Sequence, residues 1–241
     1  HVNVVVATHS LNLVDGVDIS DVVLLTLDER RRTRVERLGA RTGTPIERHL
    51  GAVAASVGLR NSVLLHERCF LAVEGDAEQQ AIPILFALSE GLPLQASGIA
   101  LWSVGGNTGA LHLAAHLHRR GRAVTLLLGA GGEDRLAVDK AFGPDCDAVV
   151  TVLATRFEGL FDEVTWANTA NAAWPRIDRP WSPQDFAPLP GAVGALLREH
   201  SQDPPANRAE MIMDLVLRLE RPVDVPRELR DVFAALRTCA Q

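Results

Sequence analysis

Cysteine and lysine are both scarce in this sequence of 241 residues, and each scarcity limits what the protein can be. Only three cysteines are present, and they are too scattered to form a disulfide framework or a zinc site of paired thiolates. We therefore expect a reducing, cytoplasmic setting. Positive charge comes almost entirely from arginine, because Lys140 is the sole lysine. That bias indicates a GC-rich genome rather than a function.

Long hydrophobic runs and an excess of positive charge are also missing. No stretch approaches the roughly 20 apolar residues that a membrane helix needs, and the first residues lack the regions of a signal peptide, so we expect no membrane contact. The formal net charge is -6, so a nucleic acid would have to be contacted through a local basic patch or a bound cation. The hydrophobic content of 47% is enough for a sizeable core.

Apolar segments of strand length alternate with helical segments in the middle of the chain. Strands are predicted at residues 70–73, 98–103, 124–128 and 148–153. The helices are predicted at residues 78–89, 108–119, 134–142 and 157–168. This alternation predicts a parallel, doubly wound sheet with helices on both faces. A functional site is expected at the carboxyl ends of its strands.

The segment before this region has a different character. Residues 3–7 form a β-branched run that predicts a buried strand, and a second strand is predicted at residues 21–27. Residues 28–41 are rich in arginine and form a connector, whose arginines either contact phosphate or lie on a solvated linker or hairpin face. A short helix is predicted at residues 46–57. Because the first residues run directly into an apolar strand, we suspect a fragment of a longer protein.

The last seventy residues are interrupted by prolines. Two helices are predicted there, at residues 206–220 and 227–238. Three tryptophans in or near this region could stack on bases, but their more natural role is to fix the loop to the core: Trp166, Trp174 and Trp181.

The strongest local signal is the segment Val-Glu-Gly-Asp-Ala-Glu at residues 73–78, at a strand-to-helix turn. Glu74 would lie at the carboxyl end of an inner strand, and Glu78 would point back over the same crevice. Converging carboxylates repel one another unless a cation lies between them, and their oxygens suit Mg²⁺ or Mn²⁺. Asp76 and Glu78 have an alternative role, because acids in a first helical turn complement the helix dipole.

These residues resemble a known family. Glu74 and Gly75 with Glu78, followed by Ala-Ile-Pro at residues 81–83, look like the opening of Toprim domains in the overcoming-lysogenization-defect (OLD) family of ATPase-nucleases. Residues 99–106, which end in Trp-Ser-Val-Gly-Gly, are similar to that family's second strand and its glycine turn.

The beginning of the chain carries a second resemblance. The run Val-Val-Ala-Thr-His-Ser at residues 5–10 resembles the strand that closes the ABC-type ATPase core in those proteins, with His9 as the residue that senses the nucleotide. The resemblance implies a Toprim-like parallel sheet flanked by helices, with an N-terminal ATPase-tail segment and a C-terminal helical appendage. The implied domains are residues 1–66, the C-terminal part of an ATPase lobe with a connector, then the Toprim domain at 67–170 and the appendage at 171–241. ATP would act only through a missing or separate ATPase lobe.

The resemblance also implies a function. It indicates a divalent-metal-dependent endonuclease that nicks or cuts DNA under the control of an ATPase, in a protein that is plausibly a homo-oligomer. Glu74 and Glu78 would bind the metal, and Glu158 matches a glutamate that often follows the fourth strand. Arg208, with Lys140 as a rival, would neutralise transition-state charge. An antiphage or DNA-repair role would follow from the resemblance only.

The sequence departs from the family after the third strand, where a pair of aspartates spaced by one residue is expected. Gly129 and Gly131 stand at those positions, and the nearest acids that could replace them as metal ligands are Glu133 and Asp134. The alternative is a catalytically impaired Toprim module that serves DNA binding, assembly or regulation. A weaker alternative is phosphate binding by the glycine-rich turn.

One helix carries three histidines, at positions 112, 116 and 118. His112 and His116 share a face, which suggests zinc binding. No acidic or thiolate partner has a compelling spacing, so we expect surface histidines on an amphipathic helix instead.

Overall fold

The computed structural model describes residues 4–40, 42–105, 108–130, 135–143, 146–187 and 193–240. The N-terminal part contains α1 (Leu11–Asp15), η1 (Ile19–Asp21), β1 (Leu24–Leu27), β2 (Thr33–Glu36), α2 (Pro45–Ser56) and α3 (Asn61–His66). The central part contains β3 (Cys69–Val73), α4 (Asp76–Glu90), η2 (Gln95–Ser97), β4 (Ile99–Ser103), α5 (Thr108–Arg119), β5 (Ala123–Leu128), α6 (Arg135–Phe142), α7 (Cys146–Val149) and β6 (Val150–Val152). The C-terminal part contains η4 (Phe157–Leu160), α8 (Glu163–Ala173), η5 (Pro183–Phe186), α9 (Val193–His200), α10 (Arg208–Val216), η6 (Pro222–Asp224) and α11 (Arg227–Ala240).

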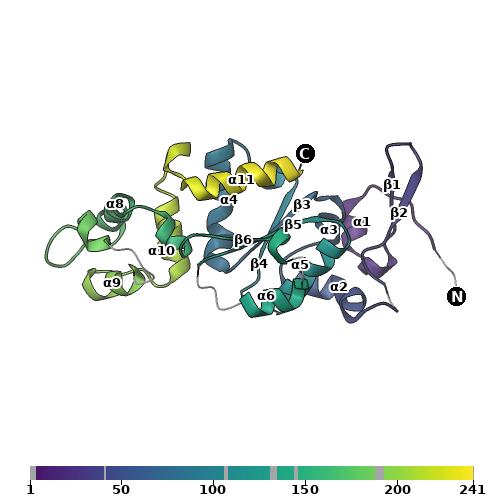
Figure 1. The fold of residues 1–241 in the computed structure, drawn as a ribbon, viewed down its shortest axis with the longest axis horizontal. Coiled ribbons are helices and arrows are strands. Elements are labelled where there is room, and N and C mark those ends of the chain that lie inside the picture. Colours follow the sequence, from purple (N-terminus) through teal and green to yellow (C-terminus); the bar gives the residue numbers. More distant parts are fainter. Residues whose placement is uncertain are drawn as a thin grey trace.

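A four-stranded parallel sheet lies at the centre of the molecule, in the order β4-β3-β5-β6 (Figure 1). Val73 at the end of β3 pairs in register with Ser103 of β4 and with Leu127 of β5. At the end of β5, Leu128 pairs with Val152 of β6. All four strands therefore end at one edge of the sheet, and the predicted parallel sheet flanked by helices is confirmed.

Both faces of β3 are buried, because its alternate side chains enter two separate cores. Cys69, Leu71 and Val73 pack in one core with α4, α8, α10 and α11. Phe70 and Ala72 pack in the other core with α2, α3, α5 and α6. A strand buried on both faces reads as a continuous apolar run, which is why this segment shows no alternation.

The predicted helix at residues 157–168 is wrong in its first half, and its second half is the beginning of α8. A 3-10 turn, η4, is followed by extended backbone at Phe161 and Asp162, and α8 then begins at Glu163. The Asp162 carboxylate accepts a hydrogen bond from the Thr165 N–H at 2.7 Å and so caps the start of α8. The indole N–H of Trp166 donates to the Glu158 carbonyl at 3.1 Å, which fixes η4 against α8.

The predicted strand at residues 148–153 is shorter than expected. A helical turn, α7, occupies residues 146–149, and only Val150–Val152 pair with β5. The two C-terminal helices exist, but α10 is shorter than the predicted range and α11 extends to Ala240. In the part of the chain that the structure describes, no helix is both long enough and apolar enough to cross a membrane.

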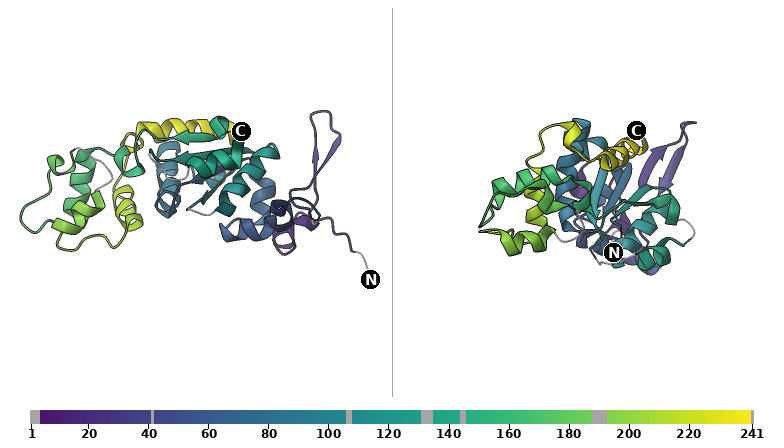
Figure 2. Two further views of the ribbon diagram at one scale, coloured as in Figure 1. Left: turned by 60° about the horizontal axis from the view of Figure 1, so that its bottom comes forward. Right: turned by 60° about the vertical axis from the view of Figure 1, so that its left-hand side comes forward.

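The N-terminal region projects from the sheet (Figure 2). The predicted buried strand near residues 3–7 is wrong for the described residues 4–7, which have no regular structure: Val4, Val5 and Val6 are 75%, 95% and 65% exposed. No described strand lies beside them to supply backbone partners. The arginine-rich segment does form a hairpin, in which β1 and β2 pair antiparallel and Asp28 closes the turn by accepting hydrogen bonds from the Arg30 and Arg32 N–H groups.

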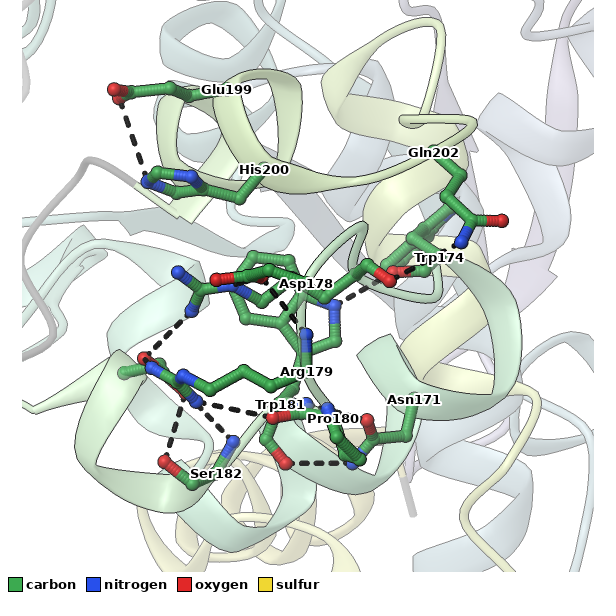
Figure 3. A network of polar contacts seen from close by, with 12 residues as sticks. Asn171, Trp174, Asp178, Arg179, Pro180, Trp181, Ser182, Glu199, His200 and Gln202 are labelled. Atoms are coloured by element: carbon green, nitrogen blue, oxygen red, sulfur yellow. Dashed lines mark hydrogen bonds and ion pairs between the residues drawn. The ribbon is translucent and has the colours of Figure 1, made fainter.

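The helices α8, α9 and α10 form a lobe at the end of the molecule opposite the N-terminus (Figures 1 and 2). All three tryptophans of this region are buried, with at most 3% exposure, as Trp166, Trp174 and Trp181. The prediction that they fix the proline-rich segment to the core is confirmed. The indole N–H of Trp181 donates to the Trp174 carbonyl at 2.7 Å, and the surrounding polar network is drawn in Figure 3.

Candidate active site at the carboxyl edge of the sheet

Glu74 follows the last residue of β3 and lies at the edge where all four strands end. Its backbone continues the β4 ladder for one step, because the Gly105 N–H donates to the Glu74 carbonyl at 2.8 Å. Its side chain reaches the opposite neighbour, where the Gly129 N–H donates to Glu74 Oε2 at 3.0 Å. The carboxylate is therefore fixed above the end of β5, with Oε1 free of hydrogen bonds from the described residues.

Gly129 comes so close to Glu74 that a larger residue would crowd it. A Cβ atom at position 129 would lie 3.1 Å from Glu74 Oε2 and 3.4 Å from the Cα of Arg156. The Ala130 N–H also donates to the Thr155 carbonyl at 3.0 Å, so the chain after β5 is bound to the chain after β6. Glycine is thus favoured here by space, and its N–H is the group that orients Glu74.

The first turn of α4 presents two acids with different surroundings. Asp76 is exposed and accepts a hydrogen bond from the Ser103 hydroxyl at 3.1 Å, which links α4 to the end of β4. Glu78 is only 4% exposed. A Cβ atom on Gly75 would lie 3.2 Å from Glu78 Oε2, so the backbone of the turn passes directly beside this buried carboxylate.

Arg208, the first residue of α10, lies between Glu78 and Glu158. Its Nη1 donates to Glu78 Oε2 at 3.1 Å and its Nη2 donates to Glu78 Oε1 at 2.5 Å. Its Nε donates to Glu158 Oε1, and its Nη2 also donates to Glu158 Oε2 at 3.0 Å. One guanidinium group therefore contacts both oxygens of two carboxylates, in the forked geometry that arginine offers and lysine does not.

Burial and charge oppose each other at this arginine. Burial alone would lower the pKa of Arg208, but its hydrogen bonds with Glu158 and Glu78 and their charges raise the pKa above its usual value. Burial alone would raise the pKa of Glu158, but the Arg208 guanidinium outweighs it and lowers that pKa below its usual 4.5. Both groups are therefore charged at neutral pH.

The edge carries more negative than positive charge. Its carboxylates belong to Glu74, Asp76, Glu78 and Glu158. Arg208 opposes them, and Arg156 adds an electrostatic contribution at Glu158. Excess carboxylate charge at the end of a parallel sheet favours a hard cation.

The fit to a divalent cation is partial. Glu74 offers a free carboxylate oxygen of the right chemistry, whereas the oxygens of Glu78 and Glu158 already accept hydrogen bonds from Arg208. Within the described ranges, no three His, Cys, Asp or Glu side chains converge as a ready-made metal site. Two of the predicted ligands, Glu133 and Asp134, lie outside the described residues, as does Gly131.

The remaining predicted residues lie elsewhere. His9 is exposed in the N-terminal segment, and this segment lies at the end of the molecule opposite α8 and α9 (Figure 1). Lys140 is exposed on α6, whose buried residues belong to the other core. The expectation of surface histidines is wrong for His116, which is 3% exposed with its Nε2 atom 3.0 Å from the Leu38 carbonyl. That contact anchors the connector after the hairpin to α5.

Sequence reasoning missed two groups that shape the edge. Ser103 binds Asp76 through its hydroxyl, and its position as the last residue of β4 was the signal that could have identified it. The Gly129 N–H orients Glu74, whereas the sequence indicated this residue as a missing aspartate and as part of a glycine-rich turn.

Part of the chain is similar to a known protein family. Residues 65–128 match the family model described as "Overcoming lysogenization defect protein-like, TOPRIM domain". This stretch is therefore similar to an OLD-like Toprim domain. It includes β3, Glu74, the whole of α4, β4 and β5. The residues before position 65 lie outside the match, and no curated protein matches the chain.

Three solved structures of OLD proteins are similar to this chain. The C-terminal region of the Xanthomonas campestris pv. campestris OLD protein, phased with platinum, matches with a TM-score of 0.52 and 19% identity, over 72% of this chain and 94% of that chain. The same region phased with iodine gives 0.48 and 17%, over 72% and 96%. The C-terminal region of the Burkholderia pseudomallei OLD protein gives 0.39 and 19%, over 73% and 99%. The first match supports the OLD C-terminal Toprim fold for this chain.

Proposed function

We propose that this chain is a divalent-metal-dependent DNA endonuclease module that cleaves phosphodiester bonds at the carboxyl edge of its sheet. The observation that carries the proposal is the convergence there of Glu74, Glu78, Glu158 and Arg208, which come from three separate segments of the chain. The similarity of residues 65–128 to an OLD-like Toprim domain supports DNA as the substrate. A nuclease-type module needs such acids, because a phosphodiester is cleaved with metal assistance.

Each residue has a distinct task in this proposal. Glu74 and Glu78 would hold Mg²⁺ or Mn²⁺ together with Glu133 and Asp134, and the bound ion would supply an activated water and stabilise the leaving oxygen. The Gly129 N–H keeps the Glu74 carboxylate fixed above the end of β5. Arg208 is bound by Glu78 and Glu158 in the metal-free chain, and its permanent charge would stabilise the negative charge that develops on the phosphate.

A plasmid-nicking assay tests the proposal. We expect the unmodified chain to convert supercoiled DNA to open circles with Mg²⁺ or Mn²⁺, and EDTA to stop it. Glu74→Ala should reduce the rate by about 100-fold or more, because a group acting directly on the reacting centre is lost. Glu220→Ala removes an exposed acid after α10 and serves as the matched control. Absence of cleavage with every metal, or full activity of Glu74→Ala, would contradict the proposal.

A catalytically impaired module is the second candidate, and Gly129 favours it. The close approach of this glycine to Glu74 leaves little room for the aspartate that the family resemblance implies. In that case the chain would bind DNA, or serve assembly or regulation, without metal-dependent cleavage. Fluorescence anisotropy with labelled duplex DNA separates the two candidates when the nicking assay is negative. Gain of nicking by a variant with aspartate at both 129 and 131 would show that only ligands were missing.

We also propose an ATPase-type lobe, in the same or another chain, as the partner of the N-terminal region. Ten of the sixteen large hydrophobic residues that are exposed among the described residues lie before β2 ends, within residues 4–36. On the hairpin, Leu25 lies opposite Val35, and both are more than 60% exposed. An isolated two-stranded hairpin is only marginally stable in water, so a covering partner is expected. The role proposed for His9 as a nucleotide sensor depends on this partner.

Hydrogen exchange tests the partner. Amides of β1 and β2 should exchange rapidly in this chain and become protected when an OLD-type ATPase lobe is added. Leu25→Asp should prevent that protection, whereas Val164→Asp, at an exposed position on α8, should not. Unchanged exchange of both strands in the mixture would refute this part of the proposal.

A further inference from the structure

The contact between Arg208 and its two acids is unusual in how unevenly the three side chains are buried. The side chains of Glu78 and Glu158 are 5% and 11% exposed, whereas that of Arg208 is 44% exposed. The acids are thus fixed in the protein interior, and the arginine reaches them from the solvent side. A buried carboxylate without a counter-charge is costly, so these two acids depend on whatever cation covers them.

The oxygens that bind Arg208 are also the oxygens that a divalent cation would use. Each hydrogen bond from the guanidinium group occupies a lone pair on Glu78 or Glu158. The guanidinium nitrogens that donate these bonds lie within 3.1 Å of the carboxylate oxygens. A divalent cation on the same oxygens would meet this positive charge at short range and be repelled by it. The guanidinium and the metal therefore compete for one set of ligands.

Arg208 can leave this position without loss of its helix. The start of α10 is capped independently, because the Asn207 side chain accepts a hydrogen bond from the Glu210 N–H at 3.0 Å. The helix is held in the core by four further buried residues: Met211, Ile212, Leu215 and Val216. Movement of the Arg208 side chain alone is therefore sufficient to expose Glu78 and Glu158.

We propose that Arg208 is an internal counter-ion of the metal-free site, which a divalent cation displaces from Glu78 and Glu158 when it binds. Release of the guanidinium from the two carboxylates and their occupation by the cation are then one coupled event. The inference rests on the proposed metal-dependent function. It adds that the Arg208 guanidinium prevents weakly bound cations from occupying the Glu78 and Glu158 carboxylates. The positive charge needed at the phosphate becomes available only when the metal is present.

A calorimetric titration with MnCl₂ tests the competition in the absence of DNA. Arg208→Met keeps an unbranched apolar stem and removes the charged guanidinium group, so Mn²⁺ should bind about tenfold more tightly or better than to the unmodified protein. Arg218→Met removes the same charge from an exposed residue after α10 and should leave the affinity unchanged. Equal or weaker Mn²⁺ binding by Arg208→Met would overturn the proposal.

Arg208→Lys covers the case in which Arg208→Met fails to fold. A single ammonium group cannot fork between both carboxylates, so this variant should also bind Mn²⁺ more tightly than the unmodified protein, by a smaller factor. If it binds Mn²⁺ no more tightly, the proposal fails.

A second readout follows the arginine itself. In ¹⁵N spectra of the unmodified protein, the Nε–H signal of Arg208 should be protected from exchange by its hydrogen bond to Glu158. Addition of Mg²⁺ should abolish that protection, and retained protection at saturating Mg²⁺ would contradict displacement. If neither the unmodified protein nor the variants bind any cation, the proposed metal-dependent function fails as well. If all of them bind with equal affinity, only the inference about Arg208 fails.

Discussion

Two networks of arginine and carboxylate groups occupy different parts of the molecule and differ in the ratio of positive to negative charges. In the C-terminal lobe, whose polar network is drawn in Figure 3, two arginines, Arg176 and Arg179, form ion pairs with two aspartates, Asp178 and Asp185. Arg176 also lies over the Trp181 ring at 4.9 Å. At the sheet edge, one arginine serves two buried acids, and two further acids lie beside it.

The sequence separation of the partners differs as well. In the lobe, the ion pairs join residues at most nine positions apart, and Asp185 also accepts hydrogen bonds from the N–H and hydroxyl of Ser182. At the edge, Arg208 is 130 residues from Glu78 and 50 from Glu158. The network in the lobe joins neighbouring residues, and its two arginines balance its two aspartates, so we expect it to stabilise a loop. The network at the sheet edge joins residues that are distant in the sequence, and its acids outnumber its arginine. That excess negative charge is suited to bind a ligand.

The largest effect is expected in the balanced network. Asp185→Asn should lower the free energy of unfolding by about 2 kcal/mol, because two arginines lose their shared buried carboxylate. Urea denaturation measures this loss. Asp203→Asn, at an exposed position after α9, should change stability by less than about 0.5 kcal/mol. Metal binding should be unaffected by both variants, and a changed Mn²⁺ affinity in Asp185→Asn would show that the two networks are coupled.

Glu158→Gln should have a smaller effect, about 1 kcal/mol at pH 7, since Arg208 keeps Glu78 as a partner. Its pH dependence is the sharper test. The pKa of Glu158 is lowered from 4.5 in the folded state, so its contribution is present above pH 4.5 and is lost as the pH falls through the folded pKa. The stability difference between the unmodified protein and the variant should therefore shrink below pH 4.5. A difference that stays constant down to pH 3 would show that the carboxylate charge is not what stabilises this network.

Gly129→Ala tests whether the lack of a side chain at position 129 is needed to hold the Glu74 carboxylate in place. The new methyl group would lie 3.1 Å from Glu74 Oε2, so Glu74 must move and lose the Gly129 N–H. We expect about 1 kcal/mol of lost stability and weaker Mn²⁺ binding. Gly51→Ala in α2 is the control, because its Cβ atom would meet only ordinary contacts with Ile19 and should stabilise the helix slightly. Unaltered Mn²⁺ affinity in Gly129→Ala would argue against an orienting role of this backbone N–H.

Much of the fold was predictable from local patterns. The helix at 108–119 and the strands of β3, β4 and β5 were predicted to within one residue, because each is an uninterrupted apolar or amphipathic run. The error at 157–168 came from treating a 3-10 turn and α8 as one helix. Asp162 is an ordinary N-cap residue, and its position marked the true start. The exposed N-terminal run could not be placed by pattern alone, since a β-branched segment is a buried strand only when another strand is beside it.

The candidate site was less predictable. Glu74 followed from its position after a buried strand, but the placement of Arg208 against Glu78 and Glu158 depends on how the C-terminal lobe returns to the sheet. No spacing rule contains that information, and only the family resemblance brought Glu158 and Arg208 into consideration. The hydrogen bond from the Gly129 N–H to Glu74 is made by the backbone, so no side chain in the sequence indicates it.

The smallest predicted effect concerns a buried histidine outside both networks. Burial lowers the pKa of His116 below its usual 6.5, although the Leu38 carbonyl and Glu47 act to raise it and Arg119 and Arg120 oppose protonation. Its contribution to stability is therefore present above pH 6.5 and is lost as the pH falls through the folded pKa. Between pH 7 and 5.5 we expect a loss of about 0.5 kcal/mol, measured by urea denaturation at each pH.

Loss of stability on acidification should then occur in two separate steps, one from His116 below pH 6.5 and one below pH 4.5 from Glu158 and the other carboxylates of lowered pKa, such as Asp185. His116→Gln should remove the first step and leave the second. His112→Gln, at an exposed position on the same helix, should leave both steps unchanged. A single step that His116→Gln does not alter would mean that the carboxylates alone set the response to acid, and that the contact between α5 and the Leu38 connector carries no charge-dependent stability.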